Sequence, residues 1–508
     1  MLEKSWKILK SGSDIRGTAI DTQDGAEINL TNAVIEKIML AFGKWITEKT
    51  ELEPSAITVA IGHDSRLSAS RIKNVCINTL RAIGINVYDC SLASTPAMYT
   101  AISALKCAAA IEITASHQPY DRNGLKFFTA EGGVTGGDIE DILEKAQNIT
   151  ESTPSEVQGS IRKINIMDYY SEKIKKLITD NIECKLGKKP LDGIKIVVDA
   201  GNGAGGFFVD KILKPLGADT EGSQFLDPDG NFPNHIPNPE DSNAITSIVN
   251  LTKESEADLG IIFDTDVDRV AVVGKNGRPI TDEKMIALTS LIALKDNPDA
   301  IIVTDSVTSN HLEDFIRKHQ GSQFRYKRGY NNVISMAKKI NKKGGNCPLA
   351  IETSGHAAFR ENNFIDDGAY LAAKIIIELA HIKSQGLNFN ELIKDLRESK
   401  EKATVRMEIK SETPTEYADK ILNHIKNYAN SNRNMELDTE NIEGIRINFT
   451  EKHRKGWAII RKSLHDPEIV LHAESEVIGG IKGIFKILKS CLARFDMLDK
   501  SQISNNGI

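Results

Sequence analysis

The feature that most constrains the fold is one order of elements that occurs three times along the chain. In each copy, an apolar run rich in β-branched residues precedes a helical stretch, a second strand and a last apolar run. The first strands are predicted at 57–62, 194–198 and 300–303, and the last runs at 108–113, 258–263 and 348–351. The first and second strands start about 28, 24 and 23 residues apart, which is typical of a strand–helix–strand crossover in a parallel sheet. The sequence therefore predicts three divergent α/β units of one topology.

The last hundred residues have a different pattern. A helix is predicted at about 414–428, followed by β-like runs at 444–449, 457–461 and 468–472 and a closing helix near 476–494. This order predicts a small antiparallel α+β domain. Because 508 residues are too many for one hydrophobic core, the length predicts three or four domains, and the three units with this last domain make four. Their predicted bounds are 1–160, 161–275, 276–398 and 399–508.

Composition excludes several classes of function. The formal net charge is −6, and there is no basic run of the kind that binds nucleic acid or anionic membrane. No apolar stretch reaches the roughly 18 residues of a spanning helix, and the N-terminus lacks the apolar core of a signal peptide. The six cysteines are scattered without a CxxC pair. These features predict reduced thiols in a cytoplasmic protein without nucleic-acid or membrane partners.

Each of the three last apolar runs ends in an unusual polar loop. The loops cover 114–117, 264–269 and 352–356. Open α/β sheets build their sites at the carboxyl ends of their strands, so three equivalent loops favour function over three unrelated surface turns.

In the second loop, Asp264, Asp266 and Asp268 alternate, so their carboxylates can converge on one hard cation. An EF-hand is excluded because Arg269 and Lys275 occupy the loop positions that need Gly and Glu. Three carboxylates leave octahedral positions for water and a phosphoryl oxygen, which favours Mg²⁺. Arg269 can hold a phosphate oxygen. The plainer interpretation is a solvated acidic turn.

The first loop places Ser116 after a strand, with His117 beside it and Lys126 downstream. Alone, Ser116 is more often a loop-capping hydroxyl than a nucleophile. The chain has no GxSxG elbow, which disfavours an α/β-hydrolase. A serine near a carboxylate-bound metal favours phosphoryl transfer, with His117 and Lys126 as candidate proton-transfer or phosphate-binding groups.

Further polar segments offer candidate binding groups. The loop 352–356 combines a carboxylate and hydroxyls that suit a vicinal sugar diol, although a helix-starting turn is the alternative. The segment 461–467 and the glycine-flanked Arg16 offer candidate phosphate contacts. A competing pattern, GxGxxG at 201–206 with Glu221 beyond it, would indicate a dinucleotide-binding oxidoreductase. Because 219–223 is a poor strand end, we interpret these glycines as a tight strand-to-helix turn.

Three motifs in this order, TASHxP at 114–119, DxDxDR at 264–269 and ExSGH at 352–356, resemble those of the α-D-phosphohexomutase superfamily (phosphoglucomutase/phosphomannomutase). The resemblance extends over nearly the whole chain. It implies a heart-shaped enzyme of four domains, in which three mixed α/β domains precede a TATA-box-binding-protein-like α+β domain. It places the active site in a central cleft where all four meet.

The same resemblance assigns roles to residues. Ser116 would carry a phosphoryl group and bind Mg²⁺ together with the three aspartates. Transfer to a hexose phosphate would give a hexose 1,6-bisphosphate, with glucose 1,6-bisphosphate as activator, and the other phosphate would return to Ser116. The residues matched to the rest of the cleft are Glu352, Ser354 and His356 for the sugar, Arg461 and Ser463 for the non-reacting phosphate, and Arg16, His117, Lys126, Arg269 and Lys327 along its lining.

Several alternatives stay open. A phosphoglucosamine mutase would share these motifs, and a non-catalytic sugar-phosphate-binding scaffold could keep the fold. His63, Tyr330 and His465 depart from residues common in relatives, which leaves the preferred sugar undecided. The sequence is compatible with a monomer or a homodimer.

Overall fold

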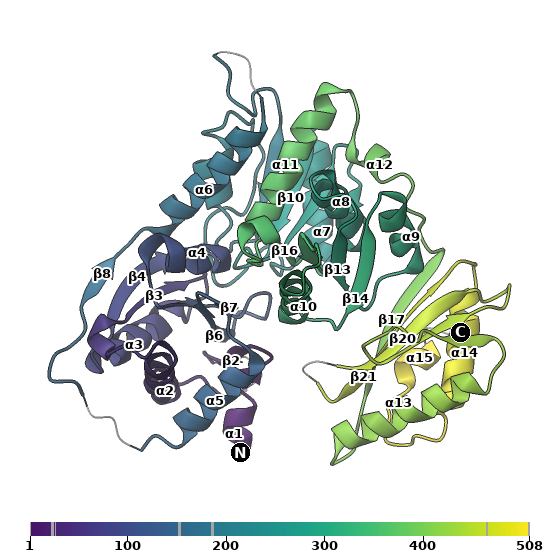
Figure 1. The fold of residues 1–508 in the computed structure, drawn as a ribbon, viewed down its shortest axis with the longest axis horizontal. Coiled ribbons are helices and arrows are strands. Elements are labelled where there is room, and N and C mark those ends of the chain that lie inside the picture. The colour runs from purple at the N-terminus through teal and green to yellow at the C-terminus, as the bar shows by residue number, and fades with distance from the viewer. Residues whose placement is uncertain are drawn as a thin grey trace. The chain divides into compact units, whose positions relative to one another are not determined.

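The computed structural model describes residues 2–505 apart from 22–24, 26, 151–153, 184–186 and 464–465. The chain, coloured by residue number in Figure 1, forms two compact units. The first unit comprises Met1–Met285 and Ser354–Glu391, and the second comprises Ile286–Thr353 and Leu392–Ile508.

The first unit begins with a mixed sheet of strand order β1-β2-β6-β5-β3-β4-β8, to which β7 adds beside β6. The strands β3, β4, β5 and β8 pair in parallel, whereas β6 runs antiparallel to β5 and β2. The strand bounds are β1 (Lys10–Ser11), β2 (Asp14–Thr18), β3 (Thr58–His63), β4 (Asn86–Leu92), β5 (Ala109–Ile113), β6 (Arg122–Thr129), β7 (Gly132–Gly133) and β8 (Ile161–Lys163).

Helices cover both faces of this sheet. The main core lies under α2, α3 and α5, and α4 packs on the other face (Figure 1). α2 buries Ile35, Ile38, Met39 and Phe42, which recur at the three- and four-residue spacing of one helix face. The helix bounds are α1 (Lys4–Lys7), α2 (Asn32–Thr50), η1 (Pro54–Ala56), α3 (Ala69–Ala82), α4 (Thr95–Leu105) and α5 (Gly136–Gln147).

The rest of the first unit holds a second sheet of order β12-β11-β10-β9, with β9 and β10 parallel and the other pairs antiparallel. α7 packs on this sheet, and α6 packs against α11. The bounds are α6 (Ile166–Asn181), β9 (Ile196–Asp199), η2 (Phe208–Leu213), α7 (Ser242–Glu254), β10 (Leu259–Phe263), β11 (Val270–Gly274), β12 (Pro279–Ile280), β16 (Ala357–Phe359), η3 (Arg360–Asn362) and α11 (Gly368–Ser384).

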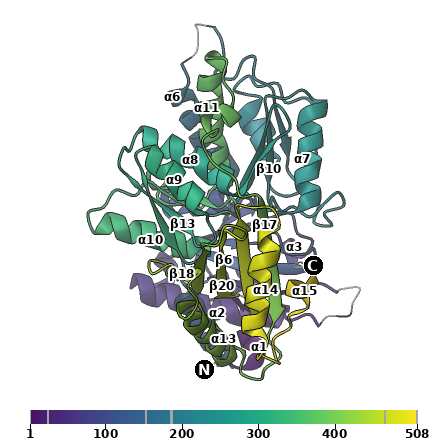
Figure 2. The same cartoon turned by 90° about the vertical axis from the view of Figure 1, so that its right-hand side faces the viewer.

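The second unit contains a parallel sheet and an antiparallel one. In the first, β13 pairs in parallel with both β14 and β15. The second has the order β17-β21-β20-β19-β18, and α13 and α14 bury its core (Figure 2). The bounds are β13 (Ile301–Asp305), α9 (Asn310–Lys318), β14 (Ser322–Tyr326), α10 (Tyr330–Lys342), β15 (Leu349–Ile351), β17 (Glu401–Glu408), α13 (Pro414–Asn430), β18 (Met435–Leu437), β19 (Ile445–Phe449), β20 (Gly456–Lys462), β21 (Glu468–Ser475), α14 (Gly480–Leu492) and α15 (Ser501–Asn505). Two helices, α8 (Asp282–Lys295) and α12 (Phe389–Leu392), cross between the residue ranges of the two units.

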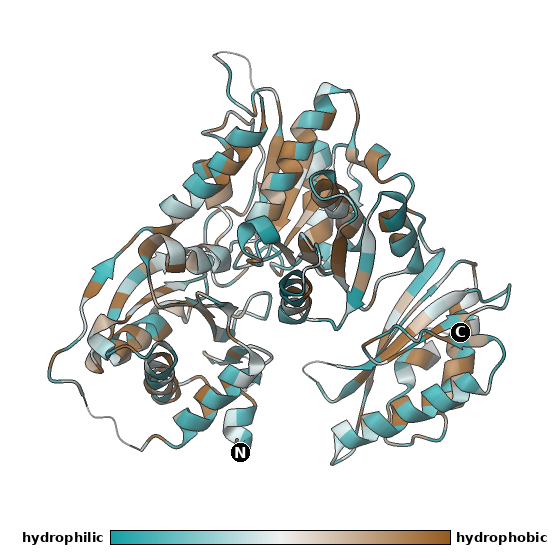
Figure 3. Cartoon of the chain, in the orientation of Figure 1, coloured by the Kyte–Doolittle hydropathy of each residue, from teal (hydrophilic) through white to brown (hydrophobic). Residues whose placement is uncertain are grey.

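The predicted threefold repeat is confirmed in its strand order. In the first copy, β3 lies between β4 and β5, and in the third copy β13 lies between β14 and β15. In the second copy β10 pairs with β9, and the place of the remaining strand is taken by parallel bridges at Asp219 and Gln224. Apolar residues, which dominate the predicted strands, are brown in Figure 3.

The structure corrects the sequence prediction in three places. In the second copy, the helical stretch after the first strand is a short π-helical turn, η2. The second strand of this copy is reduced to isolated bridges at Asp219 and Gln224. The last domain has five strands instead of three. β17 was missed because most of its exposed positions are charged, and β18 because it has only three residues.

Two further observations concern the chain's surroundings. Within the described part of the chain, no helix is long and apolar enough to cross a membrane. The five cysteines in that part, Cys76, Cys90, Cys107, Cys347 and Cys491, are buried and form no disulfide, whereas Cys184 lies outside it.

Candidate active site

Ser116 lies in the loop that leaves the end of β5, and its backbone is strained. Its φ is +50°, a left-handed conformation that residues other than glycine seldom adopt. The side chain is buried, and its Oγ donates a hydrogen bond to Asp264 Oδ2 at 3.0 Å. His117 Nδ1 lies 3.3 Å from the same Oγ. The loop thus directs the serine hydroxyl at the acidic loop of the neighbouring sheet.

Asp264, Asp266 and Asp268 converge in the loop between β10 and β11. All three are buried, and their oxygens lie within 4.8 Å of one another, so the cluster could hold a metal ion. Burial, followed by the charges of Asp268 and Asp266, raises the pKa of Asp264 well above its ordinary value. Among the described residues, Asp266 Oδ1 and Asp268 Oδ1 have no hydrogen-bond partner. Buried carboxylate oxygens without donors fit a cation ligand set.

Two cations partly neutralise this cluster. Lys126 Nζ contacts Asp266 Oδ2 at 2.8 Å and Asp268 Oδ2 at 2.5 Å. Arg269 Nε donates to Asp264 Oδ2 at 3.2 Å, and its Nη1 reaches Asn238 and Glu240. Both side chains are buried, so their charges act on the acidic loop with little screening by water.

The loop after β15 brings His356 to the same cluster. Its Nδ1 donates to Asp366 Oδ2 and lies 4.0 Å from Asp268 Oδ1. Burial opposes the protonated form, but Asp366 and Asp268 raise the pKa of His356 to about 9. His356 is therefore a cation at neutral pH. Ser354, in the same loop, is buried.

Arg16 and His117 complete the part of the site in the first unit. Arg16 Nη1 donates to the carbonyl of Ala115 at 3.3 Å, and Nη2 pairs with Asp14 at 2.7 Å. Burial first, and then Arg269 and Arg16, lowers the pKa of His117 to about 2, so its ring is neutral.

The other predicted residues lie in the second unit. Glu352 Oε1 accepts the N–H of Gly329 at 2.6 Å, two residues after the exposed Lys327. Arg461 is buried at the end of β20, and its Nη1 donates to the Lys462 carbonyl at 3.1 Å. Ser463 donates its N–H to the Glu468 carbonyl at 2.9 Å. His465, named above as a departure, lies outside the described residues.

Sequence reasoning missed several groups that support the site. Thr95 donates to Asp266 Oδ2 at 2.5 Å from the start of α4, and Asp366 holds His356. Near β13, Glu443 accepts from the Arg328 N–H at 3.1 Å and from the Ser306 hydroxyl. None of these residues belongs to a motif visible in one sequence, because each meets its partner only after folding.

The glycine-rich turn at 201–206 supports the acidic loop. The Ala204 N–H donates to the Thr265 carbonyl at 2.8 Å, and a Cβ on Gly203 would lie 2.6 Å from that oxygen. The turn therefore packs its backbone on the loop of the three aspartates. This contact supports the interpretation as a tight turn and gives the dinucleotide hypothesis no support.

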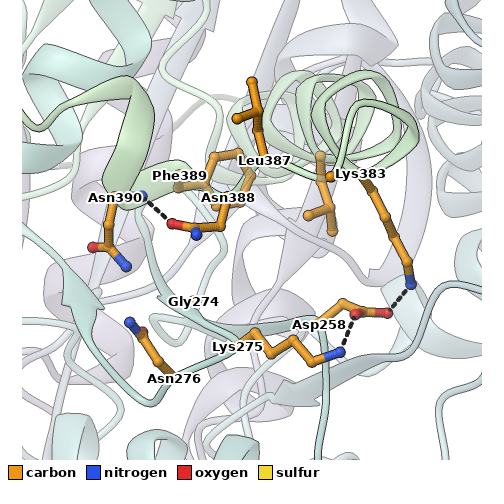
Figure 4. Close-up of a pocket in the computed structure, with 11 residues that line it drawn as sticks. Asp258, Gly274, Lys275, Asn276, Lys383, Leu387, Asn388, Phe389 and Asn390 are labelled. Carbon is orange, nitrogen blue, oxygen red and sulfur yellow. Dashed lines mark hydrogen bonds and ion pairs between the residues drawn. The ribbon is translucent and has the colours of Figure 1, made fainter.

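A hollow of about 560 Å³ lies at the opposite end of the β10–β11 hairpin from the acidic loop (Figure 4). Leu387 and Phe389 line it together with the amides of Asn276, Asn388 and Asn390. Its two lysines, Lys275 and Lys383, both pair with Asp258. The two lysines thus share a single carboxylate, which compensates one of their two charges.

Comparison with known proteins identifies the family. Three models described as phosphoglucomutase/phosphomannomutase, alpha/beta/alpha domains I, II and III, match residues 7–153, 168–277 and 281–399. The chain is 32% identical over 478 residues to a phosphomannomutase/phosphoglucomutase of Pseudomonas syringae pv. tomato, covering 93% of each. It is 28% identical to a phosphoglucomutase of Neisseria gonorrhoeae, covering 87% of this chain and 89% of that one.

A solved structure gives the same answer for the fold. A phosphoglucomutase/phosphomannomutase family protein from Burkholderia thailandensis superposes with a TM-score of 0.78 at 26% identity, covering 97% of this chain and 98% of that one. The chain belongs to the phosphoglucomutase/phosphomannomutase family, within the α-D-phosphohexomutase superfamily. It is a phosphohexomutase, an isomerase that acts by phosphoryl transfer. The predicted fold of three α/β domains followed by a further sheet domain is confirmed.

Proposed function

We propose that this enzyme interconverts the 1-phosphates and 6-phosphates of glucose and mannose through a phosphoryl group carried on Ser116. One observation carries the proposal: a buried serine Oγ lies 3.0 Å from one of three convergent carboxylates that could share a metal ion. A hydroxyl in that position has little use in binding alone. It can accept and return a phosphoryl group.

Asp264, Asp266 and Asp268 would hold Mg²⁺ together with the phosphate on Ser116. Their donor set consists of hard oxygens, as Mg²⁺ prefers, and two of those oxygens have no hydrogen-bond partner among the described residues. When bound, Mg²⁺ would stabilise charge on the phosphoryl group during transfer.

In the forward half-reaction, a sugar hydroxyl oxygen forms a bond to phosphorus while the bond between phosphorus and Ser116 Oγ breaks. The hydroxyl proton leaves, Ser116 Oγ regains a proton, and the product is hexose 1,6-bisphosphate. The second half-reaction returns the other phosphate to Ser116. Neutral His117, 3.3 Å from Oγ, can hydrogen-bond to the serine oxygen in either state. Lys126, Arg269 and Arg16 would offset the charge that develops on the phosphoryl oxygens.

The sugar and its second phosphate would be held by the remaining candidates. We propose that Glu352, Ser354 and His356 bind sugar hydroxyls. We further propose that Lys327, Arg461 and Ser463 bind the non-reacting phosphate. Glucose 1,6-bisphosphate would serve as intermediate and as activator of the unphosphorylated enzyme.

The relatives named above favour glucose and mannose over glucosamine as the sugar, since their names are phosphoglucomutase and phosphomannomutase. A net charge of −6 supports a small-molecule substrate without nucleic-acid or membrane partners, and the scattered cysteines support a cytoplasmic enzyme. A monomer or homodimer is proposed. Light scattering on the purified chain tests it, and a larger assembly would contradict it.

Coupled assays with the 1-phosphates of glucose, mannose and glucosamine test the substrate. Each is run with Mg²⁺ and glucose 1,6-bisphosphate. We expect turnover of the first two; fast turnover of glucosamine 1-phosphate alone would favour the phosphoglucosamine alternative. No turnover of any of the three would favour the non-catalytic scaffold.

The phosphoryl carrier is tested by intact mass and activity of Ser116→Ala. We expect one phosphoryl group on the native protein and none on this variant, together with loss of turnover. Ser91→Ala is the matched control, because Ser91 also has a positive φ, +56°, in the same domain but is exposed. A phosphoryl group that persists in Ser116→Ala would move the carrier elsewhere.

A further inference from the structure

We infer that Arg66 is a positioning residue that sets the backbone of the Ser116 loop and so directs the serine oxygen at the acidic loop. This inference rests on the proposed role of Ser116. It gives a function to the turn between β3 and α3.

The Arg66 side chain is fully buried and uses all five of its N–H groups. Nε donates to Asp64 Oδ2 at 3.2 Å. The four terminal N–H groups reach carbonyls of the loop that contains Ser116, at 2.5 to 2.8 Å. Those carbonyls belong to Ser116, Gln118, Pro119 and Arg122. A rigid planar fork with four carbonyl partners determines how this loop turns.

The backbone N–H of Ser116 is also held, through Thr114, by Asp64. The Ser116 N–H donates to Thr114 Oγ1 at 2.8 Å, and that hydroxyl donates to Asp64 Oδ2 at 2.7 Å. Asp64 also accepts the backbone N–H of Arg66 at 2.9 Å. Both the N–H and the carbonyl of Ser116 are therefore tied to the Asp64–Arg66 pair. This double attachment holds a non-glycine residue at φ +50°.

We call the Asp64–Arg66 pair and its hydrogen bonds to the Ser116 loop the clamp. A loop of the second domain, residues 227–241, packs over it. The Phe232 ring centre lies 5.3 Å from the Arg66 guanidinium carbon. A Cβ on Gly230 would lie 2.5 Å from the Leu67 nitrogen, so only glycine allows this approach. The same loop supplies Asn238 and Glu240 to Arg269. One loop therefore supports both the serine loop and the acidic loop.

Arg71 provides a matched control. It lies five residues further on, and its Nη2 donates to the carbonyls of Ala19 and Leu30 at 2.7 and 3.1 Å, while Nη1 reaches Asn32. It thus supports backbone in the same domain without touching the Ser116 loop. A general stability role would make Arg66 and Arg71 equivalent, whereas a positioning role separates them.

The test compares full-length Arg66→Lys and Arg71→Lys. Because an error of about 1 Å in a reacting group costs about 100-fold in rate, we expect Arg66→Lys to lose about that factor in kcat. Its KM for glucose 1-phosphate should change less than about threefold, because no substrate contact is removed. Phosphorylation of Ser116 by glucose 1,6-bisphosphate should slow by the same factor as kcat. Arg71→Lys should lower Tm with kcat unchanged. Equal kcat in the two variants would overturn the inference.

A second pair of variants, at Thr114, tests the inference if Arg66→Lys does not fold. Thr114→Val removes the acceptor of the Ser116 N–H with little change in volume, and Thr114→Ser keeps the hydroxyl. We expect a large kcat loss in the first and recovery of most of it in the second. A Thr114→Val enzyme within about threefold of the native kcat would contradict the clamp. If Ser116→Ala is inactive while Arg66→Lys is fully active, only this inference fails; if Ser116→Ala keeps its phosphoryl group, the proposed carrier fails first.

Discussion

The two units place their candidate site residues in different surroundings. In the first unit, Ser116, Lys126, Arg269 and the three aspartates are buried and bonded mainly to one another. In the second unit, Glu352 and Arg461 are buried, but Lys327 is exposed and Ser463 is half-buried. The first set is organised before any substrate arrives, and the second leaves polar groups for a ligand.

The proposed reaction gives this difference a reason. The same phosphoryl carrier must meet a hydroxyl at either end of the sugar, so the bisphosphate has to be held in two orientations. The transfer groups can stay fixed through both half-reactions, whereas the binding groups must accept two different faces of one ligand. Rigid transfer groups also avoid reorganisation during the chemical step.

The largest expected effect is a loss of phosphoryl transfer when the acidic cluster of the first unit is altered. Asp266→Asn removes one charge from the acidic cluster and should lower kcat about 1,000-fold, because charge on the transferred group is then less well stabilised. Steady-state kinetics at saturating Mg²⁺ measure it, with circular dichroism to verify the fold. A near-native kcat would contradict the assignment of this cluster to the metal.

The variant Arg461→Ala tests the proposed substrate-binding residues of the second unit. Loss of a charge-assisted contact to the non-reacting phosphate should raise KM about 10- to 100-fold. The fall in kcat should be smaller than the rise in KM. The measurement is KM and kcat for glucose 1-phosphate, with Arg433→Ala as control at an exposed arginine of the same unit. If kcat falls as far as in Asp266→Asn while KM is unchanged, the two units do not differ as proposed.

The variant Asp366→Asn tests whether Asp366 only orients His356 or belongs to the metal site. Asp366 accepts a hydrogen bond from His356 and is not one of the three predicted metal ligands, so we expect a kcat loss of about 10- to 100-fold. Mg²⁺ affinity, measured by titration calorimetry, should fall less than kcat does. A loss of Mg²⁺ binding would instead make Asp366 part of the metal site.

The smallest expected effect concerns stability and pH. Burial opposes protonation of His235, but its hydrogen bond to Asp199 and the charge of Asp199 raise its pKa above the ordinary 6.5. The folded state therefore binds this proton more tightly than the unfolded state. The contribution of His235 to the free energy of unfolding is therefore fully present below pH 6.5. It is lost as the pH rises through the raised pKa of His235. His235→Gln should lower the free energy of unfolding by about 1–2 kcal/mol at acidic pH and by less at alkaline pH. Urea unfolding across this range measures it; a difference that grows with pH would contradict the assignment.

The sequence alone predicted the repeated α/β units and their parallel strands, because buried parallel strands are continuous apolar runs and a crossover needs a helix of limited length. It also predicted Ser116, the three aspartates and the loop 352–356, because their polar residues directly follow those runs. These are local patterns. The same reasoning missed β17, whose exposed charged positions hide the strand.

Only the tertiary structure decided which of these groups meet. It directed Ser116 at Asp264 across 148 positions of sequence, and it paired Lys126 with Asp266 and Asp268. It also showed that Arg66 holds the Ser116 loop and that the loop at 352–356 divides between the two units after Thr353. Such contacts join residues far apart in the chain, and they depend on side-chain geometry and burial that no local pattern of residues encodes.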